Sequence, residues 1–149
     1  MQTIAERTRH LLHEIDALAR AAGRAPGDVT LVGISKTHGP ERIREAVAAG
    51  LRHVGESYVQ EALPKLDALR ELPVTWHFVG RLQANKTAAV AAAFDWVHAV
   101  DRLRIAQRLN DQRPAGRGPL DCCIEVNLSG EDSKGGVSPA DLPALAAAI

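Results

Sequence analysis

The sequence predicts an α/β protein in which parallel strands alternate with helices in the manner of a (β/α)8 TIM-type barrel. Apolar runs rich in β-branched residues begin about every 20 to 25 residues, and a segment with helical spacing separates each pair. G-x-G-x-x-G and Walker sequences are absent, which counts against a doubly wound sheet, the alternative fold with this alternation. A full barrel needs eight strands and about 250 residues, so the five units present predict the front part of a barrel.

The first helix is expected to begin at a capping box and to lead into the first strand. Thr3 and Glu6 have the spacing at which each side chain bonds the other's backbone. Apolar residues then recur at helical intervals until Gly23, which ends the helix. Residues 29–36 form an apolar run of the kind found in strands that are buried on both faces, and Lys36 stands at its carboxyl end.

The same alternation accounts for the rest of the chain. Pro40 stands near the first position of the second helix, and Gly50 ends it. The remaining strands are expected at residues 53–56, 74–79, 95–100 and 120–127, and the remaining helices at residues 58–69, 85–93, 102–109 and from 138 onward. The last helix is still running at Ile149, so we expect the chain to be cut after its fifth strand.

Lys36 is the most informative single residue for chemistry. An amine at the end of a buried strand is well placed to lose its hydration, which favours the neutral form. A neutral amine attacks an aldehyde and forms a Schiff base. From this segment alone, a hydrated lysine that opens a loop is the favoured interpretation, and the rest of the chain changes that balance.

Composition excludes several classes of protein. Hydrophobic residues make up 46% and charged residues 24%, as in an ordinary globular domain. Lys plus Arg and Asp plus Glu number 18 each, so there is no basic excess for nucleic acid. No apolar run is long enough for a membrane span, and the N-terminus lacks the pattern of a signal peptide. Cys122 and Cys123 are adjacent, which predicts reduced thiols and a cytoplasmic protein without a metal site.

Polar residues follow the carboxyl ends of all five expected strands, where a barrel places its chemistry. They are Ser35–Thr37, Glu56–Tyr58, the run from Gly80 to Lys86, Asp101 with Arg102, and Asn127 with Ser129. Loops are polar in any case, so this pattern alone is a weak indication of a site.

Several of these runs resemble the pyridoxal phosphate homeostasis protein family, whose members bind pyridoxal 5′-phosphate on an alanine-racemase-like barrel without a second domain. The resemblance covers nearly the whole chain, and the run W-H-F-V-G-R-L-Q-A-N-K at residues 76–86 is its most specific part. The other matching runs are S-K-T at 35–37, H-V-G-E-S-Y-V-Q-E at 53–61, F-D-W-V-H at 94–98, E-V-N-L-S at 125–129 and S-K-G-G-V at 133–137.

The resemblance implies a site for the cofactor pyridoxal phosphate. Lys36 would hold it as a Schiff base, in agreement with the chemistry expected of that amine. The loop after the second strand would border the cofactor, but Ser57 replaces the asparagine usual in the family and lacks its amide donor. His77 either lines the barrel mouth near the pyridine ring or is a hydrogen-bonded core histidine. Asn127 either reaches inward or serves a turn.

The resemblance also implies that part of the site is missing from this chain. In the family the cofactor phosphate is held by segments near the C-terminal end of the barrel, which would lie beyond Ile149. We therefore expect residues 1–149 to form a partial cofactor-binding barrel domain with weakened binding. We also expect self-association through the sheet edges left open at the first and fifth strands.

The function expected from these observations is binding of pyridoxal phosphate for cofactor homeostasis, without turnover. The alternatives are an enzyme, either a pyridoxal-phosphate-dependent racemase or a class I aldolase that uses Lys36 on a carbonyl substrate. A racemase needs a second base opposite the lysine, and the only tyrosine is Tyr58. We expect no second domain to supply another base.

Overall fold

The computed structural model describes residues 2–149 and contains one sheet of five parallel strands. The strands are β1 (Val32–Ile34), β2 (His53–Glu56), β3 (Thr75–Phe78), β4 (Trp96–Val100) and β5 (Asp121–Ile124). They are hydrogen-bonded in sequence order, β1-β2-β3-β4-β5. A doubly wound sheet reverses its strand order at a switch point. This sheet does not reverse, so its topology is that of a barrel wall and the doubly wound alternative is wrong.

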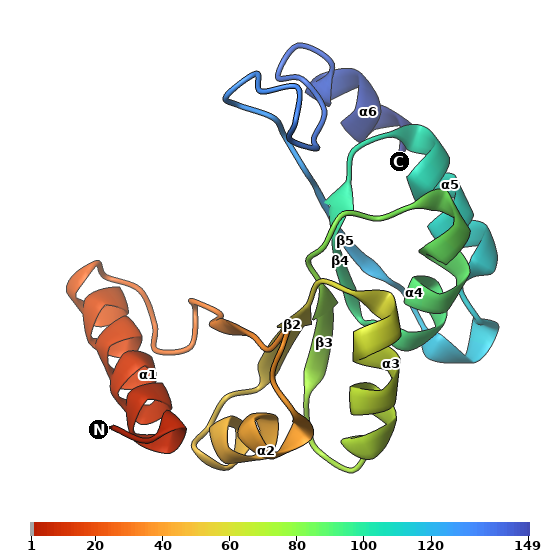
Figure 1. Cartoon of the computed structure of the whole chain (residues 1–149). Helices are drawn as coiled ribbons and strands as arrows, with labels where there is room; N and C mark the ends of the chain where they lie inside the picture. The colour runs from red at the N-terminus through yellow and green to blue at the C-terminus, as the bar shows by residue number, and fades with distance from the viewer. Residues whose placement is uncertain (1) are drawn as a thin grey trace.

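The helices alternate with the strands as predicted. They are α1 (Ile4–Ala21), α2 (Pro40–Ala48), α3 (Val59–Ala68), α4 (Thr87–Ala93), α5 (Leu103–Gln112) and α6 (Leu142–Ala148), with short 3-10 turns η1 (Ala84–Lys86) and η2 (Ala115–Arg117). The capping box predicted at Thr3 and Glu6 is present, and Pro40 is the first residue of α2. Helices α2 to α5 cover the outer face of the curved sheet, and α1 lies beside α2 (Figure 1).

The first and last strands are shorter than the sequence predicts. The apolar runs at residues 29–36 and 120–127 predict extended chain throughout, but β1 has three residues and β5 has four. Each of these strands pairs with a single neighbour within residues 2–149, so only one row of ladder hydrogen bonds defines it. Val126 forms an isolated bridge with Val137 instead of extending β5.

The hydrophobic core lies between the outer face of the sheet and the helices. Phe78 from β3 meets Phe94, which follows α4, edge to face at a centroid distance of 5.4 Å, and both side chains are fully buried. Val54, Val97 and Ile105 complete the centre of this layer. Such a layer fixes each strand against the helix that follows it, so the loops at the strands' carboxyl ends have rigid supports.

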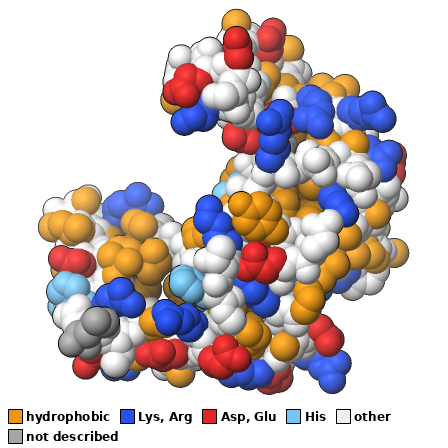
Figure 2. Space-filling view, in the orientation of Figure 1, with side chains coloured by type: hydrophobic (Ala, Val, Ile, Leu, Met, Phe, Trp, Pro, Cys, Tyr) orange, Lys and Arg blue, Asp and Glu red, His pale blue; other side chains and the backbone are white. Residues whose placement is uncertain are grey.

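The molecule is a crescent rather than a closed barrel. Helix α1 forms one arm, and the segment from β5 to α6 forms the other (Figures 1 and 2). The inner side of the sheet is uncovered at its β1 edge, where Ile34 is 48% exposed. None of the helices within residues 2–149 combines the length and the hydropathy that a membrane span needs.

Candidate functional site

Lys36 is the second residue after β1, in a turn at the carboxyl end of the sheet. Its side chain is exposed. The sequence predicts that burial of the strand strips its hydration, and that expectation is wrong. The reason is the position of β1 at the edge of the sheet, where no further strand within residues 2–149 covers it.

The amine of Lys36 has no carboxylate partner among the residues that the structure describes. It takes part in none of the ion pairs formed within residues 2–149. By contrast, Lys65 pairs with Glu56 at 2.9 Å and Glu61 at 2.6 Å, and Lys134 lies 3.9 Å from Glu131. Lys36 is therefore an accessible amine with no competing salt bridge.

The turns after β2 and β3 lie next to one another at the same end of the sheet. In the register, Ile34 pairs with Gly55 and Gly55 pairs with His77. Two residues further along the first two strands come Lys36 and Ser57, so Ser57 follows the strand that neighbours β1. A methyl group on Gly80, after β3, would lie 2.0 Å from the Ser57 carbonyl oxygen. The two loops are thus in direct backbone contact.

A small hollow opens beside Ser57. It measures about 270 Å³ and is lined by Ser57, Tyr58 and Phe78 together with the basic residues Arg81 and Lys86. These residues belong to the two motifs that follow β2 and β3, so the structure brings together parts of the chain that are far apart in sequence.

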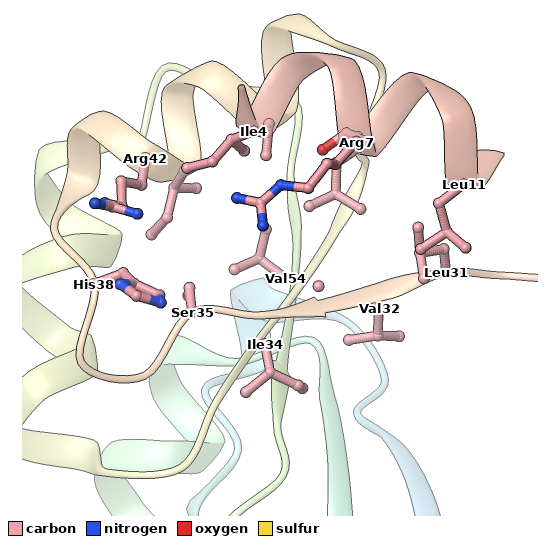
Figure 3. A pocket seen from close by; sticks show the side chains of 15 residues that line it. Ile4, Arg7, Leu11, Leu31, Val32, Ile34, Ser35, His38, Arg42 and Val54 are labelled. Atoms are coloured by element: carbon pink, nitrogen blue, oxygen red, sulfur yellow. The ribbon is translucent and has the colours of Figure 1, made fainter. Parts of the chain in front are cut away.

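A larger and mostly apolar hollow lies on the outer side of β1. It measures about 450 Å³ and separates β1 from α1 and α2 (Figure 3). Arg7, His38 and Arg42 project at one end, while the side chain of Ile34 points away from it (Figure 3). Lys36 itself does not line this hollow, although Ser35 and His38 of the same turn do.

His77 lies at the centre of a chain of three imidazoles that crosses β2, β3 and β4. Its Nε2 is 2.9 Å from His53 Nδ1, and its Nδ1 is 2.9 Å from His98 Nε2. The ring also stacks on Trp96 at a centroid distance of 5.7 Å. Both nitrogens of His77 are thus engaged, as in a hydrogen-bonded core histidine.

Burial lowers the pKa of His77 to about 4. Repulsion from His98 and His53 in their charged forms adds to this, and Asp95 offsets part of it. Burial also lowers the pKa of His98. Near neutral pH the central imidazole is therefore uncharged, and each contact pairs one N–H with one bare nitrogen.

The histidine chain predicts a loss of stability in mild acid. The unfolded chain binds a proton at His77 near pH 6.5, whereas the folded chain binds it only near pH 4. The His77 contribution is therefore fully present above pH 6.5 and is lost as pH falls from 6.5 towards 4, by about 3 kcal/mol in total. Urea unfolding at pH 7.5, 6 and 5 measures this loss.

The control for this prediction separates His77 from the other histidines. We expect His77→Gln to flatten the dependence of stability on pH between 6.5 and 5. His13 lies at an exposed position of α1, and we expect His13→Gln to show the same pH dependence as the unchanged chain. An equal slope in the His77→Gln protein would show that another group carries the effect.

Asn127 serves a turn. Its Oδ1 accepts the Gly130 N–H at 3.0 Å, and its Nδ2 donates to the Glu131 carbonyl at 3.0 Å. Of the two roles that the sequence leaves open, the turn is the one that these bonds describe. An exposed loop therefore uses both ends of the amide.

Sequence reasoning missed a buried polar cluster behind the Lys36 turn. Glu56 is fully buried although it lies in a strand, and Lys65 is 7% exposed although it lies in a helix. Two signals pointed to it: a carboxylate within the second strand, and Glu61 four residues before Lys65, the spacing that places two helical side chains together. Neither signal reveals that the two elements meet at Ser35.

Comparison with known proteins agrees with this fold. The family model for the alanine racemase N-terminal domain matches residues 7–149. The pyridoxal phosphate homeostasis proteins of Pseudomonas aeruginosa and Escherichia coli are 55% and 49% identical to the whole chain. The chain spans 65% of the length of each of these relatives.

Solved structures give the same result. PipY of Synechococcus elongatus, in a structure with pyridoxal phosphate bound, is 39% identical over 99% of this chain and 66% of its own, with a TM-score of 0.75. A Bifidobacterium adolescentis protein is 31% identical over 96% of this chain and 62% of its own, with a TM-score of 0.80. The resemblance and the partial barrel inferred from the sequence are thus confirmed, and the chain belongs to the alanine racemase N-terminal domain family.

Proposed function

We propose that residues 1–149 form part of a cytoplasmic pyridoxal-phosphate-binding barrel domain that holds the cofactor on Lys36 for homeostasis, without turnover. One observation carries this proposal: a free, accessible amine stands at the carboxyl end of β1 in a chain similar to proteins named for pyridoxal phosphate homeostasis. The cofactor-bound structure of PipY supports the same ligand class.

The residues near Lys36 fit this ligand. Bound pyridoxal phosphate would supply an aldehyde, and Lys36 is the residue that would hold it as a Schiff base. Ser57, beside β1, is the proposed neighbour in the second loop. The polar side-chain atoms of His77 and Asn127 are already hydrogen-bonded within the chain. We therefore propose that these two residues border the cofactor indirectly: His77 fixes the sheet, and Asn127 fixes the loop after β5.

The test is an absorbance titration of the purified 149-residue chain with pyridoxal phosphate. We expect a Schiff-base band that grows to saturation with added cofactor. A class I aldolase that reserves Lys36 for a carbonyl substrate would give no saturable band with this cofactor. The absence of any band would contradict the proposed ligand.

A racemase is the second candidate, because the matching family model is that of the alanine racemase N-terminal domain. Racemisation needs a base on the face of the substrate opposite the lysine. The only tyrosine of the chain, Tyr58, stands just before α3 and is 57% exposed. No aromatic hydroxyl is therefore held in a desolvated position within residues 2–149.

We expect no racemisation of alanine beyond that caused by free pyridoxal phosphate. Exchange of the alanine α-proton in D2O, followed by proton NMR with and without the chain, measures this directly. A stereospecific exchange rate well above that of the cofactor alone would establish an enzyme and reject the binding role.

We also propose that the chain self-associates through the open edges of its sheet. Strands β1 and β5 each leave one row of backbone groups unpaired within residues 2–149, and Ile34 is exposed beside the first. Light scattering after gel filtration is expected to give a mass above the 16.0 kDa of one chain. A single 16.0 kDa species that melts cooperatively would contradict this expectation.

A further inference from the structure

Both residues that flank Lys36 are tied to one polar cluster, which we call the Lys65 network: Ser35, Thr37, Glu56, Glu61 and Lys65. Ser35, Glu56 and Lys65 are buried, Glu61 is partly buried and Thr37 is exposed. On one side, the Ser35 hydroxyl donates to Glu56 Oε1 at 2.5 Å, and Lys65 Nζ donates to the Ser35 carbonyl at 3.0 Å. On the other side, the Thr37 N–H donates to Glu61 Oε1 at 2.6 Å. The Lys36 side chain itself takes no part in these hydrogen bonds.

Lys65 joins the two halves of this network. From α3 its ammonium donates to Glu56 Oε1 at 2.9 Å and to Glu61 Oε1 at 2.6 Å. Burial works against the charged amine, but the hydrogen bonds that Lys65 donates to Glu61 and Glu56 outweigh it and raise the pKa of Lys65. The bond from Lys65, with that from the Thr37 N–H, lowers the pKa of Glu61. Lys65 and Glu61 are thus both charged near neutral pH.

The network also holds an unfavourable backbone conformation. Thr37 has φ +66°, and it is the one residue other than glycine with positive φ among residues 2–149. A β-branched residue avoids this region unless its surroundings enforce it. The Glu61 carboxylate supplies that constraint at the Thr37 N–H, and the His38 N–H closes the turn on the Ser35 carbonyl at 3.0 Å.

Stability alone is a poor explanation for such a cluster. Burying ion pairs generally adds little net stability compared with apolar side chains of similar size. Glu56 Oε2 remains buried without a partner within residues 2–149, so the carboxylate is not fully satisfied. What the cluster does achieve is to fix the backbone immediately before and after one exposed amine.

We propose that Glu61 and Lys65 are positioning residues that set the direction in which the Lys36 side chain leaves the end of β1. This inference rests on the proposed role of Lys36 as the cofactor lysine. Neither Glu61 nor Lys65 is proposed to touch the cofactor. Each acts through the backbone of the turn, so that the amine is held ready for an aldehyde.

The test uses Glu61→Ala and Glu61→Gln in the 149-residue chain. Glutamine keeps an oxygen that accepts the Thr37 N–H, whereas alanine does not. We expect Glu61→Ala to weaken the apparent affinity for pyridoxal phosphate by about tenfold, as for the loss of one hydrogen bond to a charged group, and Glu61→Gln to restore most of it. Asp67→Ala removes an exposed carboxylate from the same helix and is expected to change nothing.

Amide hydrogen exchange without cofactor gives a second readout. Glu61→Ala is expected to speed exchange at Thr37 while leaving β3 and β4 as protected as before. Glu61→Met fills the same volume without accepting a hydrogen bond, and the same result is expected if the alanine protein folds poorly. Faster exchange at Thr37 with unchanged cofactor affinity would overturn the positioning role. Loss of Lys36 as the attachment site would instead reject the proposed function.

Discussion

Lys36→Ala is expected to abolish the Schiff-base absorbance that pyridoxal phosphate produces with the unchanged chain. Alanine has no amine, and two of the other three lysines already lie beside carboxylates. Lys65 is buried in ion pairs with Glu56 and Glu61, and Lys134 lies in the loop after β5 beside Glu131. A spectrophotometric titration of both proteins at equal concentration measures the difference.

Two further variants make this result specific. Lys36→Arg keeps the positive charge but forms no stable Schiff base, so it is expected to behave like the alanine protein. Lys134→Ala removes an exposed amine far along the chain and is expected to leave the band unchanged. A saturable band of normal size in the Lys36→Ala protein would show that another amine carries the cofactor.

Gly80→Ala is expected to cause a large loss of stability. The added methyl carbon would lie 2.0 Å from the carbonyl oxygen of Ser57 and 2.7 Å from its carbonyl carbon. Both are backbone atoms, so the loops after β2 and β3 must separate to admit it. Overpacking of this kind costs about 3 kcal/mol or more when the neighbour cannot rotate away, and urea unfolding measures it.

Gly116→Ala is the matched control for Gly80→Ala. Gly116 lies in the exposed turn η2, and a methyl group there would meet no atom within 4 Å. We expect its stability to stay within about 0.5 kcal/mol of the unchanged chain. Equal stability of the Gly80→Ala and Gly116→Ala proteins would mean that the contact between the two loops is not maintained in solution.

The regular parts of the fold were predictable from the sequence because local signals specify them. These signals are the capping box at Thr3, the proline that opens α2 and the apolar runs of the three central strands. Each of them depends only on residues that are close together in the sequence. The lengths of β1 and β5 were not predictable in this way. They depend on how many neighbours each strand has, which is a property of the assembled sheet.

The same distinction between local features and features of the assembled sheet applies to the candidate site. The position of Lys36 at the end of a strand followed from the sequence, but its exposure did not, because exposure depends on the open edge beside β1. The partners of His77 come from β2 and β4, and those of Ser35 come from β2 and α3. Contacts between side chains more than twenty residues apart leave no pattern in a single sequence.

Reductive trapping tests most directly whether Lys36 is the amine that holds pyridoxal phosphate. The 149-residue chain is saturated with cofactor, reduced with borohydride, digested and analysed by peptide mass. We expect the pyridoxyl group on the peptide that contains Lys36, at close to one group per chain. Modification that falls mainly on Lys65, Lys86 or Lys134, or that spreads over all four lysines, would contradict it.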